Sequence, residues 1–354
     1  MTPTVTVIGL GNMGRGMALT LHRAGFTVQG SDIDADARRR LADEGLATLA
    51  LEALGASDVY LLSLPTSAHV EHVLKASPGL LDLAPAGSVI MDTSTSDPAV
   101  TRRLAAQVEA KGLEWLDAPV SGGPAGAIGG QLGMLLGGSA ATVARLAPVL
   151  DALSAKATHV GGPGSGHVVK LANNYLCAAH LLTTAEAVAM ASRAGVDPEA
   201  CLQGLNSGSG RSAVSEVNFP RWILSEGFDS GFTMGLMRKD LRLARQTAGE
   251  LAMPEGLLAA VVDAWHAEAE TLPDGEDFNA ITRSLLDAAR RYAATDQPSA
   301  IPPSEESSSL ATPGPSAPVT PSPSCLTPPA SIPPPRPPTG SPDASSRATA
   351  RRSP

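Results

Sequence analysis

The chain contains few aromatic residues, few cysteines and no long apolar run. Phe, Trp and Tyr make up 3% of its 354 residues although 43% of residues are hydrophobic, so the core must be aliphatic and rich in alanine. The three cysteines, Cys177, Cys201 and Cys325, lie far apart. This spacing argues against a disulfide framework and a metal site, and it favours a reducing, intracellular setting. The sequence contains no stretch of 18 apolar residues, so it predicts no membrane span.

The chain also has fewer basic than acidic residues. The chain has 26 Lys and Arg against 35 Asp and Glu, a formal net charge of −9. This balance argues against a surface for nucleic acid or anionic membranes, but it allows a local basic pocket for a small acid. The first apolar run, Val5–Leu10, is short and ends in glycines, and the first strand begins almost at Met1. We therefore expect no targeting segment and a cytoplasmic protein.

The composition changes sharply near Thr295. Residues 295–354 hold 17 of the 30 prolines, many serines and no aromatic residue. Such a segment buries too little apolar surface to offset its ordering entropy, so the sequence predicts a disordered Pro/Ser-rich tail. The run Pro333–Pro338 is compatible with a polyproline ligand, although a passive tail is the simpler interpretation.

Residues 1–162 alternate short apolar runs with helical patterns. This alternation is typical of βαβ units and a parallel sheet, so the sequence predicts an α/β Rossmann-type domain. The helical patterns include Met13–Ala24 and Ala99–Lys111. The predicted strands are Thr4–Ile8, Thr27–Ser31, Val59–Leu64, Ser88–Met91, Glu114–Ala118 and Leu132–Gly137.

A different pattern begins at Gly166. Residues 166–194 contain no proline and are apolar on almost every side, which predicts a long buried helix between the glycine-rich loop 161–166 and Gly195. An all-α second domain is therefore expected over residues 163–294. Its further helical patterns are Pro198–Leu205, Met237–Glu250, Gly256–Glu268 and Asn279–Ala294.

Residues 5–14 form an apolar strand that runs into a GxGxxG loop and a helix. Gly9 permits the tight turn, Gly11 lets the backbone approach a pyrophosphate, and Gly14 lets the helix pack close to the strand. The free N–H groups at the helix start attract phosphates. This context predicts a dinucleotide site far better than the glycines alone.

Asp32 ends the second predicted strand, 18 residues after Gly14. A carboxylate at this place can accept hydrogen bonds from both ribose hydroxyls and repels a 2′-phosphate, so NAD is expected and NADP is less favoured. Arg38 and Arg39 follow and can soften that preference.

Three further segments resemble the β-hydroxyacid dehydrogenases, a family that includes the 3-hydroxyisobutyrate dehydrogenases and tartronate semialdehyde reductases. The segments are Asp117–Gly123 (DAPVSGG), Gly166–Asn174 (GHVVKLANN) and Lys239–Leu241 (KDL). The resemblance covers residues 4 to about 292. It implies a Rossmann domain and an all-α domain linked by the long helix, with the active site in the cleft between them.

Lys170 resembles the catalytic lysine of this family, which acts as a general acid and base. It lies in the first turns of a mostly apolar helix, where burial lowers the pKa of an amine towards the working range. Asn174 lies four residues later on the same helix face and is expected to orient the lysine or the reacting oxygen. The alternative interpretation is a surface lysine at a helix start.

Ser121, Gly122 and Gly123 follow an extended segment. Their backbone N–H groups and the Ser121 hydroxyl can hold a carboxylate, whereas the simpler interpretation is a tight turn. The resemblance assigns this segment to substrate binding. It also implies that Lys239 reaches the active site near substrate and nicotinamide, although lysines in such charged runs are usually solvated.

The resemblance implies further cofactor contacts. They come from the glycine loop, from the end of the third predicted strand, from a threonine near the nicotinamide and from a late acidic residue. Asp240 is assigned a structural role, and His69 receives no catalytic role. The cofactor-binding residues expected in addition to the three glycines, Asp32 and Lys239 are Leu10, Asn12, Met13, Leu64, Pro65, Thr95 and Asp277.

These observations predict NAD-dependent oxidation of a 3-hydroxyisobutyrate-like acid to its semialdehyde, or the reverse. The segment Leu205–Ser212 and Phe219-Pro220 favour this activity over tartronate semialdehyde (2-hydroxy-3-oxopropionate) reduction, which remains an alternative. A non-catalytic NAD-binding interaction module and an imine-reducing relative are further alternatives, and Lys170 disfavours both. We expect a small carboxylate substrate, no metal, and a homodimer or homotetramer, as is common among such relatives.

Overall fold

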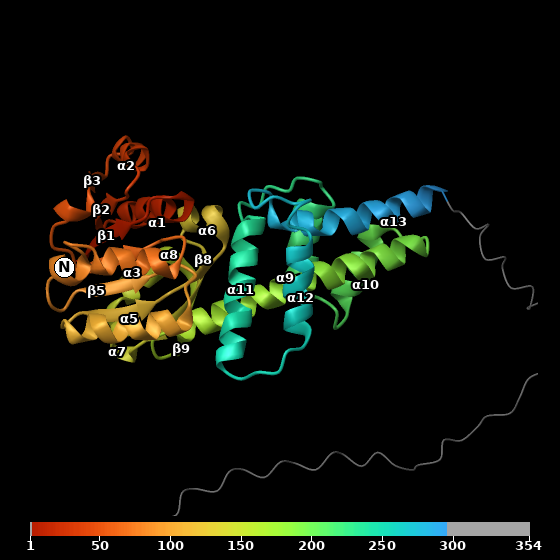
Figure 1. Cartoon of the computed structure of the whole chain (residues 1–354). Helices are drawn as coiled ribbons and strands as arrows, with labels where there is room; N and C mark the ends of the chain where they lie inside the picture. The colour runs from red at the N-terminus through yellow and green to blue at the C-terminus, as the bar shows by residue number, and fades with distance from the viewer. Residues whose placement is uncertain (1, 296–354) are drawn as a thin grey trace, which may run out of the picture. The chain divides into compact units, whose positions relative to one another are not determined.

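The computed structural model describes residues 2–295 (Figure 1). The predictions on the Pro/Ser-rich tail, including the run Pro333–Pro338, lie outside the described residues apart from Thr295. The described part of the chain belongs to one compact unit, in which a strand-containing half precedes a helical half.

One mixed sheet lies at the centre of the first half, with strand order β3-β2-β1-β4-β5-β6-β8-β7, and β9 paired to β8. The first six strands in this order are parallel. The order places a topological switch point between β1 and β4, where doubly wound folds bind their ligands. The strands are β1 (Thr4–Ile8), β2 (Thr27–Ser31), β3 (Ala47–Leu49), β4 (Val59–Leu62), β5 (Val89–Asp92), β6 (Glu114–Asp117), β7 (Val120–Ser121), β8 (Leu132–Gly138) and β9 (Ser154–Gly161).

The predicted parallel sheet is correct for β1 to β6 and incomplete beyond them. The segment predicted at Leu132–Gly137 is strand β8, which runs antiparallel to β6 and β7. Strand β9 pairs parallel to β8, but most of its residues are exposed, so it lacks the apolar pattern that marks a buried strand. Strands β3 and β7 have three and two residues, too few for a periodic signal.

Two apolar cores cover the two faces of the sheet. Leu61 of β4 points into the core with α1 and α8, whereas its neighbours Tyr60 and Leu62 point into the core with α3 and α5. Because both faces are covered, the central strands β4 (VYLL) and β5 (VIMD) are buried at every residue and appear in the sequence as nearly continuous apolar runs. The helices of this half are α1 (Asn12–Arg23), α2 (Ala35–Ala42), α3 (Ser67–Lys75), α4 (Leu80–Leu83), α5 (Pro98–Ala110), α6 (Gly123–Gly129), α7 (Ala140–Arg145) and α8 (Ala147–Leu153), with a 3₁₀ turn at Leu51–Ala53.

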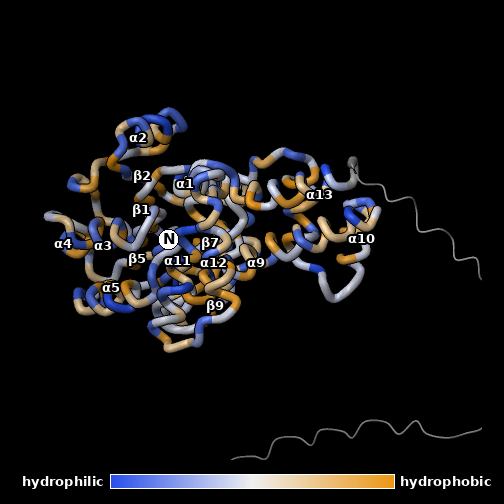
Figure 2. Tube along the Cα trace, turned by 45° about the vertical axis from the view of Figure 1, so that its right-hand side comes forward, coloured by the Kyte–Doolittle hydropathy of each residue, from blue (hydrophilic) through white to orange (hydrophobic). Residues whose placement is uncertain are grey.

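The long helix α9 (Ser165–Arg193) is the axis of the helical half. It shares one apolar core with α11, α12 and α13, and hydrophobic stretches of α9 and α13 lie beside one another in Figure 2. No helix within residues 2–295 is long and apolar enough to cross a membrane. The other elements are α10 (Pro198–Ser207), a π-helical segment (Val214–Ile223), α11 (Met234–Glu250), α12 (Leu257–Ala267), a 3₁₀ segment (Phe278–Thr282) and α13 (Arg283–Thr295).

Candidate active site

The glycine loop connects β1 to α1 at the switch point of the sheet. Gly9 has φ +92°, and a Cβ there would lie 2.2 Å from the Ser63 carbonyl oxygen. A Cβ on Gly14 would lie 1.8 Å from the Gly9 carbonyl oxygen, so these two glycines are required by packing. A Cβ on Gly11, by contrast, would meet no heavy atom of residues 2–295 within 4 Å. The open side of the loop is therefore at Gly11.

The start of α1 fits a pyrophosphate. Gly11 is the N-cap, no side chain caps the helix, and the first turn contains no acidic residue. The first backbone N–H groups of the helix are thus available to phosphate oxygens. Asn12 and Met13 form the first turn, as predicted for this loop.

Asp32 follows β2 at the edge of this loop. Its carboxylate accepts the backbone N–H of Leu10 at 2.6 Å and that of Asp34 at 2.9 Å, which fixes its orientation. Arg38 donates to the carbonyl oxygens of Asp32 and Ile33, and Arg39 donates to Asp36. Both arginines therefore have partners of their own, which weakens the argument that they recruit a 2′-phosphate.

Lys170 lies 6% exposed in the second turn of α9, and its Nζ donates to the Ser121 hydroxyl at 2.9 Å. Burial lowers the pKa of this amine below its ordinary value. The carboxylate of Asp240 and the thiol of Cys177 oppose that shift, and the ammonium of Lys239 adds to it. Lys170 is therefore not the solvated lysine of the alternative interpretation.

Ser121 ends β7 and leads into two glycines in the left-handed region. Gly122 has φ +120° and Gly123 has φ +62°, conformations that side chains rarely adopt. This turn keeps the Ser121 hydroxyl within reach of Lys170 and leaves a backbone without side chains beside it. The geometry is compatible with the predicted carboxylate loop.

Asp240 joins the polar groups of α9 and α11. Its Oδ2 accepts from Asn174 Nδ2 at 2.6 Å. Its Oδ1 lies 3.2 Å from Lys239 Nζ as an ion pair, although that oxygen accepts no well-aligned hydrogen bond from the described residues. Lys239 Nζ donates to the carbonyl oxygens of Pro65 at 3.2 Å and Thr95 at 3.1 Å. Asp240, predicted to have a structural role, therefore lies between Lys239 and Asn174.

The start of α9 is capped by a residue outside the helix. Asp117 Oδ1 accepts from the Gly164 N–H at 2.7 Å, and its Oδ2 accepts from the His167 N–H at 3.2 Å. A Cβ on Gly166 would lie 2.8 Å from Asp117 Oδ2. Burial raises the pKa of Asp117, against the opposing effects of His167 and the two amide donors. This carboxylate holds the helix that carries Lys170 against the end of β6.

His167 is fully buried one turn before Lys170. Its ring nitrogens lie 2.9 Å from the Thr101 hydroxyl and 3.0 Å from the Ser94 carbonyl oxygen. The Ser94 hydroxyl in turn accepts from the Leu64 N–H at 3.0 Å. Neither His167 nor Asp117 was predicted to support the site. Both lie inside the family motifs, but the sequence does not show which residues they bond.

The structure thus brings two groups of polar side chains together. Lys170 donates to Ser121, whereas Asp240 pairs with Asn174 and with Lys239, whose Nζ also donates to the backbone of Pro65 and Thr95. Helix α9 carries a member of each group, Lys170 and Asn174. Asp277 is not joined to either group by any hydrogen bond within residues 2–295. Its carboxylate accepts from Ser230 and Asn279, so its predicted cofactor contact stays a prediction.

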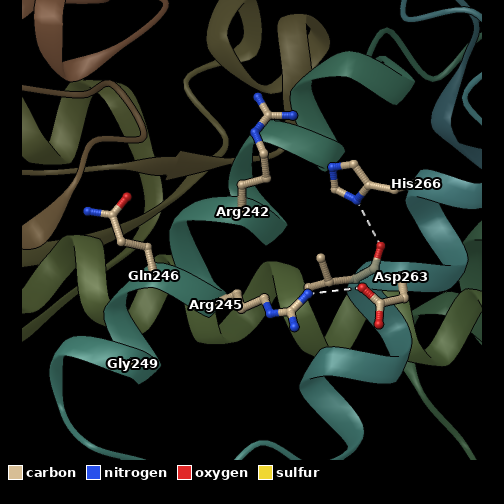
Figure 3. Close-up of a pocket in the computed structure, with 7 residues that line it drawn as sticks. Arg242, Arg245, Gln246, Gly249, Asp263 and His266 are labelled. Carbon is tan, nitrogen blue, oxygen red and sulfur yellow. Dashed lines mark hydrogen bonds and ion pairs between the residues drawn. The ribbon is translucent and has the colours of Figure 1, made fainter.

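A groove of about 400 Å³ lies elsewhere, between α11 and α12 (Figure 3). Arg242, Arg245 and His266 line it, and Arg245 is bonded to Asp263. Its lining includes neither Lys170 nor Ser121, so this groove is separate from the buried lysine and its partners. The buried amine and its partners identify the candidate active site. Residues 2–295 contain no group of three or more His, Cys, Asp or Glu arranged for a metal ion.

Comparison with known families agrees with this geometry. Residues 4–161 match the model described as the NAD binding domain of 6-phosphogluconate dehydrogenase. Residues 164–285 match the model described as NAD-binding of NADP-dependent 3-hydroxyisobutyrate dehydrogenase. These matches support a nicotinamide dinucleotide, NAD, as the cofactor.

Individual relatives extend the similarity to most of the chain. The 3-hydroxyisobutyrate dehydrogenase of Pseudomonas aeruginosa is 36% identical over 289 residues, which cover 79% of this chain and 97% of the relative. The 2-hydroxy-3-oxopropionate reductase of Escherichia coli is 38% identical over 248 residues, covering 70% and 84%. A solved structure of Mycobacterium tuberculosis 3-hydroxyisobutyrate dehydrogenase with L-serine has a TM-score of 0.75 at 30% identity, covering 80% of this chain and 99% of that one.

Proposed function

Because the chain belongs to the β-hydroxyacid dehydrogenase family, we propose that it oxidises a 3-hydroxyisobutyrate-like acid to its semialdehyde, or catalyses the reverse reduction. The observation that carries this proposal is the buried Lys170 amine, hydrogen-bonded to Ser121. A buried amine with a lowered pKa is a functional group rather than a packing residue, because an unpaired ammonium is costly to bury.

In the proposed oxidation the substrate loses a hydride and a proton to two different acceptors, and in the reduction it gains both. When bound, NAD supplies the hydride acceptor. In oxidation, the neutral Lys170 amine takes the hydroxyl proton of the substrate as the carbon–hydrogen bond breaks and the carbonyl forms. In reduction, the Lys170 ammonium returns that proton to the carbonyl oxygen. General acid–base transfer of this kind typically contributes about 10²–10⁴-fold to the rate.

Four neighbours set the behaviour of Lys170. Burial favours the neutral amine that oxidation needs, and Lys239 strengthens this effect, whereas Asp240 favours the ammonium that reduction needs. Asn174 is held by Asp240 and is expected to orient the lysine or the reacting oxygen. The Ser121 hydroxyl and the N–H groups of Gly122 and Gly123 are proposed to hold the substrate carboxylate, with Lys239 nearby.

The comparisons also support a second candidate substrate, tartronate semialdehyde. The E. coli 2-hydroxy-3-oxopropionate reductase matches about as strongly as the P. aeruginosa 3-hydroxyisobutyrate dehydrogenase, so tartronate semialdehyde reduction is the second candidate activity. A pocket distinguishes acids that differ by one methylene by only about 1–3 kcal/mol. The contacts of Lys170 with Ser121 argue against a non-catalytic NAD-binding module, which would have no need to bury an amine.

The proposal is tested by measuring NADH formation with a panel of acids: 3-hydroxyisobutyrate, 3-hydroxypropionate, L-serine and glycerate. NADH consumption is measured with tartronate semialdehyde. We expect turnover of at least one 3-hydroxy acid, and a kcat/KM that favours 3-hydroxyisobutyrate over glycerate. Preference for tartronate semialdehyde would favour the second activity. Tight NAD binding without turnover of any acid in the panel would contradict the proposal.

Domain division and assembly remain proposals. We divide the chain into residues 1–162, 163–294 and 295–354, which is supported by the end of β9 at Gly161 and the start of α9 at Ser165. A homodimer or homotetramer is supported by exposed apolar side chains on α9, such as Leu176 at 52% and Met190 at 71% exposure. Light scattering after size exclusion measures the number of subunits.

A further inference from the structure

Asp277 directs both carboxylate oxygens into the protein. Its Oδ2 accepts from the Ser230 N–H at 2.7 Å and from the Ser230 hydroxyl at 2.5 Å. Its Oδ1 accepts from the backbone N–H of Asn279 at 3.0 Å and from the Asn279 side-chain amide at 2.8 Å. A carboxylate can accept about four hydrogen bonds, and Asp277 already accepts four. Little accepting capacity is therefore left for a cofactor hydroxyl.

Ser230 belongs to a strap, residues 226–233, that connects the π-helical segment to α11. Two residues of the strap that are not glycine have a left-handed backbone, Glu226 with φ 58° and Phe228 with φ 43°. Such conformations cost free energy and persist only where the surroundings impose them. The strap must therefore be held from outside.

Phe228 donates its N–H to the Trp222 carbonyl oxygen, and the Arg283 guanidinium lies over its ring, whereas the segment around Asp277 holds residues 230–233 of the strap. Thr233 and Asp277 form an antiparallel bridge, and the Phe278 N–H donates to the Phe232 carbonyl oxygen at 3.0 Å. The rings of Phe232 and Phe278 meet edge to face, with centroids 5.2 Å apart. Among these contacts only the Asp277 carboxylate fixes Ser230, the residue at the middle of the strap.

The strap lies against the candidate carboxylate loop. A Cβ on Gly231 would lie 3.3 Å from Pro124 Cδ, and a Cβ on Gly123 would lie 3.7 Å from the Ser230 carbonyl oxygen. Gly123 is two residues from Ser121, the partner of Lys170. A displacement of Ser230 would therefore reach the loop that is proposed to bind the substrate carboxylate.

We propose that Asp277 is a positioning residue, a latch that fixes the strap against the loop Ser121–Pro124 and so sets the geometry of carboxylate binding. This inference rests on the proposed function of that loop. It differs from the predicted cofactor contact of Asp277 in a measurable way, because a latch affects the KM of the acid, whereas a cofactor contact affects the KM of NAD.

The test compares Asp277→Asn with Asp229→Asn, an exposed residue of the same strap whose side chain makes no hydrogen bond within residues 2–295. Asp277→Asn puts an amide where Ser230 needs an acceptor. We expect the KM for 3-hydroxyisobutyrate to rise about tenfold, the scale of one hydrogen bond to a charged group, with the KM for NAD within about twofold. Asp229→Asn is expected to change neither value. Ser230→Ala is a milder variant that tests the same bond if Asp277→Asn does not fold.

A rise in the KM for NAD alone would overturn the latch and support the cofactor contact, and two unchanged KM values would overturn it as well. Hydrogen exchange of the backbone amides separates these failures from a failure of the proposed function. Even if the parent turns over no acid, Asp277→Asn is expected to speed exchange in both the strap and residues 121–126. Unchanged exchange in residues 121–126 would overturn the latch.

Discussion

The glycine loop and the lysine centre are assembled in different ways. The loop comes from one stretch of chain, residues 9–14, and within residues 2–295 the only side chain from elsewhere that is hydrogen-bonded to it is Asp32, which accepts the Leu10 N–H. The lysine centre collects Ser121 from β7, Lys170 and Asn174 from α9, and Lys239 from α11. The glycine loop is expected to bind the cofactor through its backbone. The lysine centre depends on buried charged side chains, and each of these needs its partner from another segment.

This difference predicts a separation of effects. Changes in the glycine loop alter backbone packing or cofactor binding, because no catalytic side chain lies there. Changes at Lys170 alter rate and pH dependence and leave the cofactor site intact, whereas changes at Lys239, which donates to the backbone of Pro65 and Thr95, are expected to affect both. A substitution that violates this separation would show that the two regions are coupled more tightly than the hydrogen bonds indicate.

The largest effect is expected for Lys170→Met. It removes the proton acceptor but keeps a side chain of similar length, so kcat/KM falls by about 10³-fold, within the 10²–10⁴ range of general acid–base transfer. The dissociation constant of NAD, measured by calorimetry, stays within about twofold. The melting temperature does not fall, because the variant no longer buries an amine.

Lys156→Met, on the exposed strand β9, is the matched control and retains the parent rate. If Lys170→Met kept more than about a tenth of the parent kcat/KM, Lys170 would not be the general base.

Alanine substitutions at Gly14 and Gly11 test packing and cofactor binding separately. Gly14→Ala places a methyl group 1.8 Å from the Gly9 carbonyl oxygen, so we expect a loss of about 1–3 kcal/mol or more in the free energy of unfolding. Gly11→Ala meets open space, so the melting temperature is kept while NAD binding weakens by at least about tenfold, because the methyl group occupies the path of the pyrophosphate. Calorimetry and thermal melts of both variants measure the two effects, and equal losses of stability would contradict the assignment.

The sequence predicted the local elements well. The bounds of β1 and β2 are the predicted ones, and α9 begins one residue before the predicted Gly166. Helix α9 is long and apolar on most sides, and the short strands β1 and β2 are marked by the glycine loop and by Gly25, so the local sequence defines them. The fold class and the family are confirmed, whereas the roles of the individual site residues remain predictions.

The sequence did not predict the polar pairs that join distant segments. Asp117 caps α9 from another element, and Asp240 bonds Asn174 across 66 positions. A carboxylate in a motif gives no sign of which amide it will meet, because that depends on how two elements pack. The same limit applies to Asp277, which the family pattern assigns to the cofactor although its carboxylate bonds Ser230 and Asn279.

Asp32→Ala tests how much the Asp32 carboxylate contributes to NAD binding and to the choice between NAD and NADP. The variant lacks the carboxylate that is expected to accept hydrogen bonds from the two ribose hydroxyls, so NAD binding weakens by about 10–100-fold, or about 1.4–2.7 kcal/mol in total. Removal of the negative charge also raises the relative use of NADP. Initial rates with both cofactors measure the ratio, and Asp43→Ala, an exposed residue after α2, serves as control. An unchanged ratio would remove Asp32 from the account of cofactor choice.

The smallest and most specific effects concern the pH dependence of the lysine centre. Oxidation needs the neutral Lys170 amine, so kcat/KM for oxidation falls as the pH drops through the pKa of Lys170. The carboxylate of Asp240 raises that pKa and the ammonium of Lys239 lowers it. Asp240→Asn is therefore expected to move the acidic limb of the profile to lower pH, and Lys239→Gln to move it to higher pH.

The opposite signs make this test independent of general damage to the site. A variant that only loosens the site lowers the rate at every pH and leaves the midpoint of the limb where it was. Asp263→Asn, which removes a carboxylate outside the lysine centre, is the control that should not move the midpoint. Lys239→Gln also loses its bonds to Pro65 and Thr95, so its KM for NAD rises, but that change does not shift a limb governed by Lys170. Shifts of the same sign in both variants would mean that a group other than Lys170 controls the profile, and the lysine centre would then have to be reassigned.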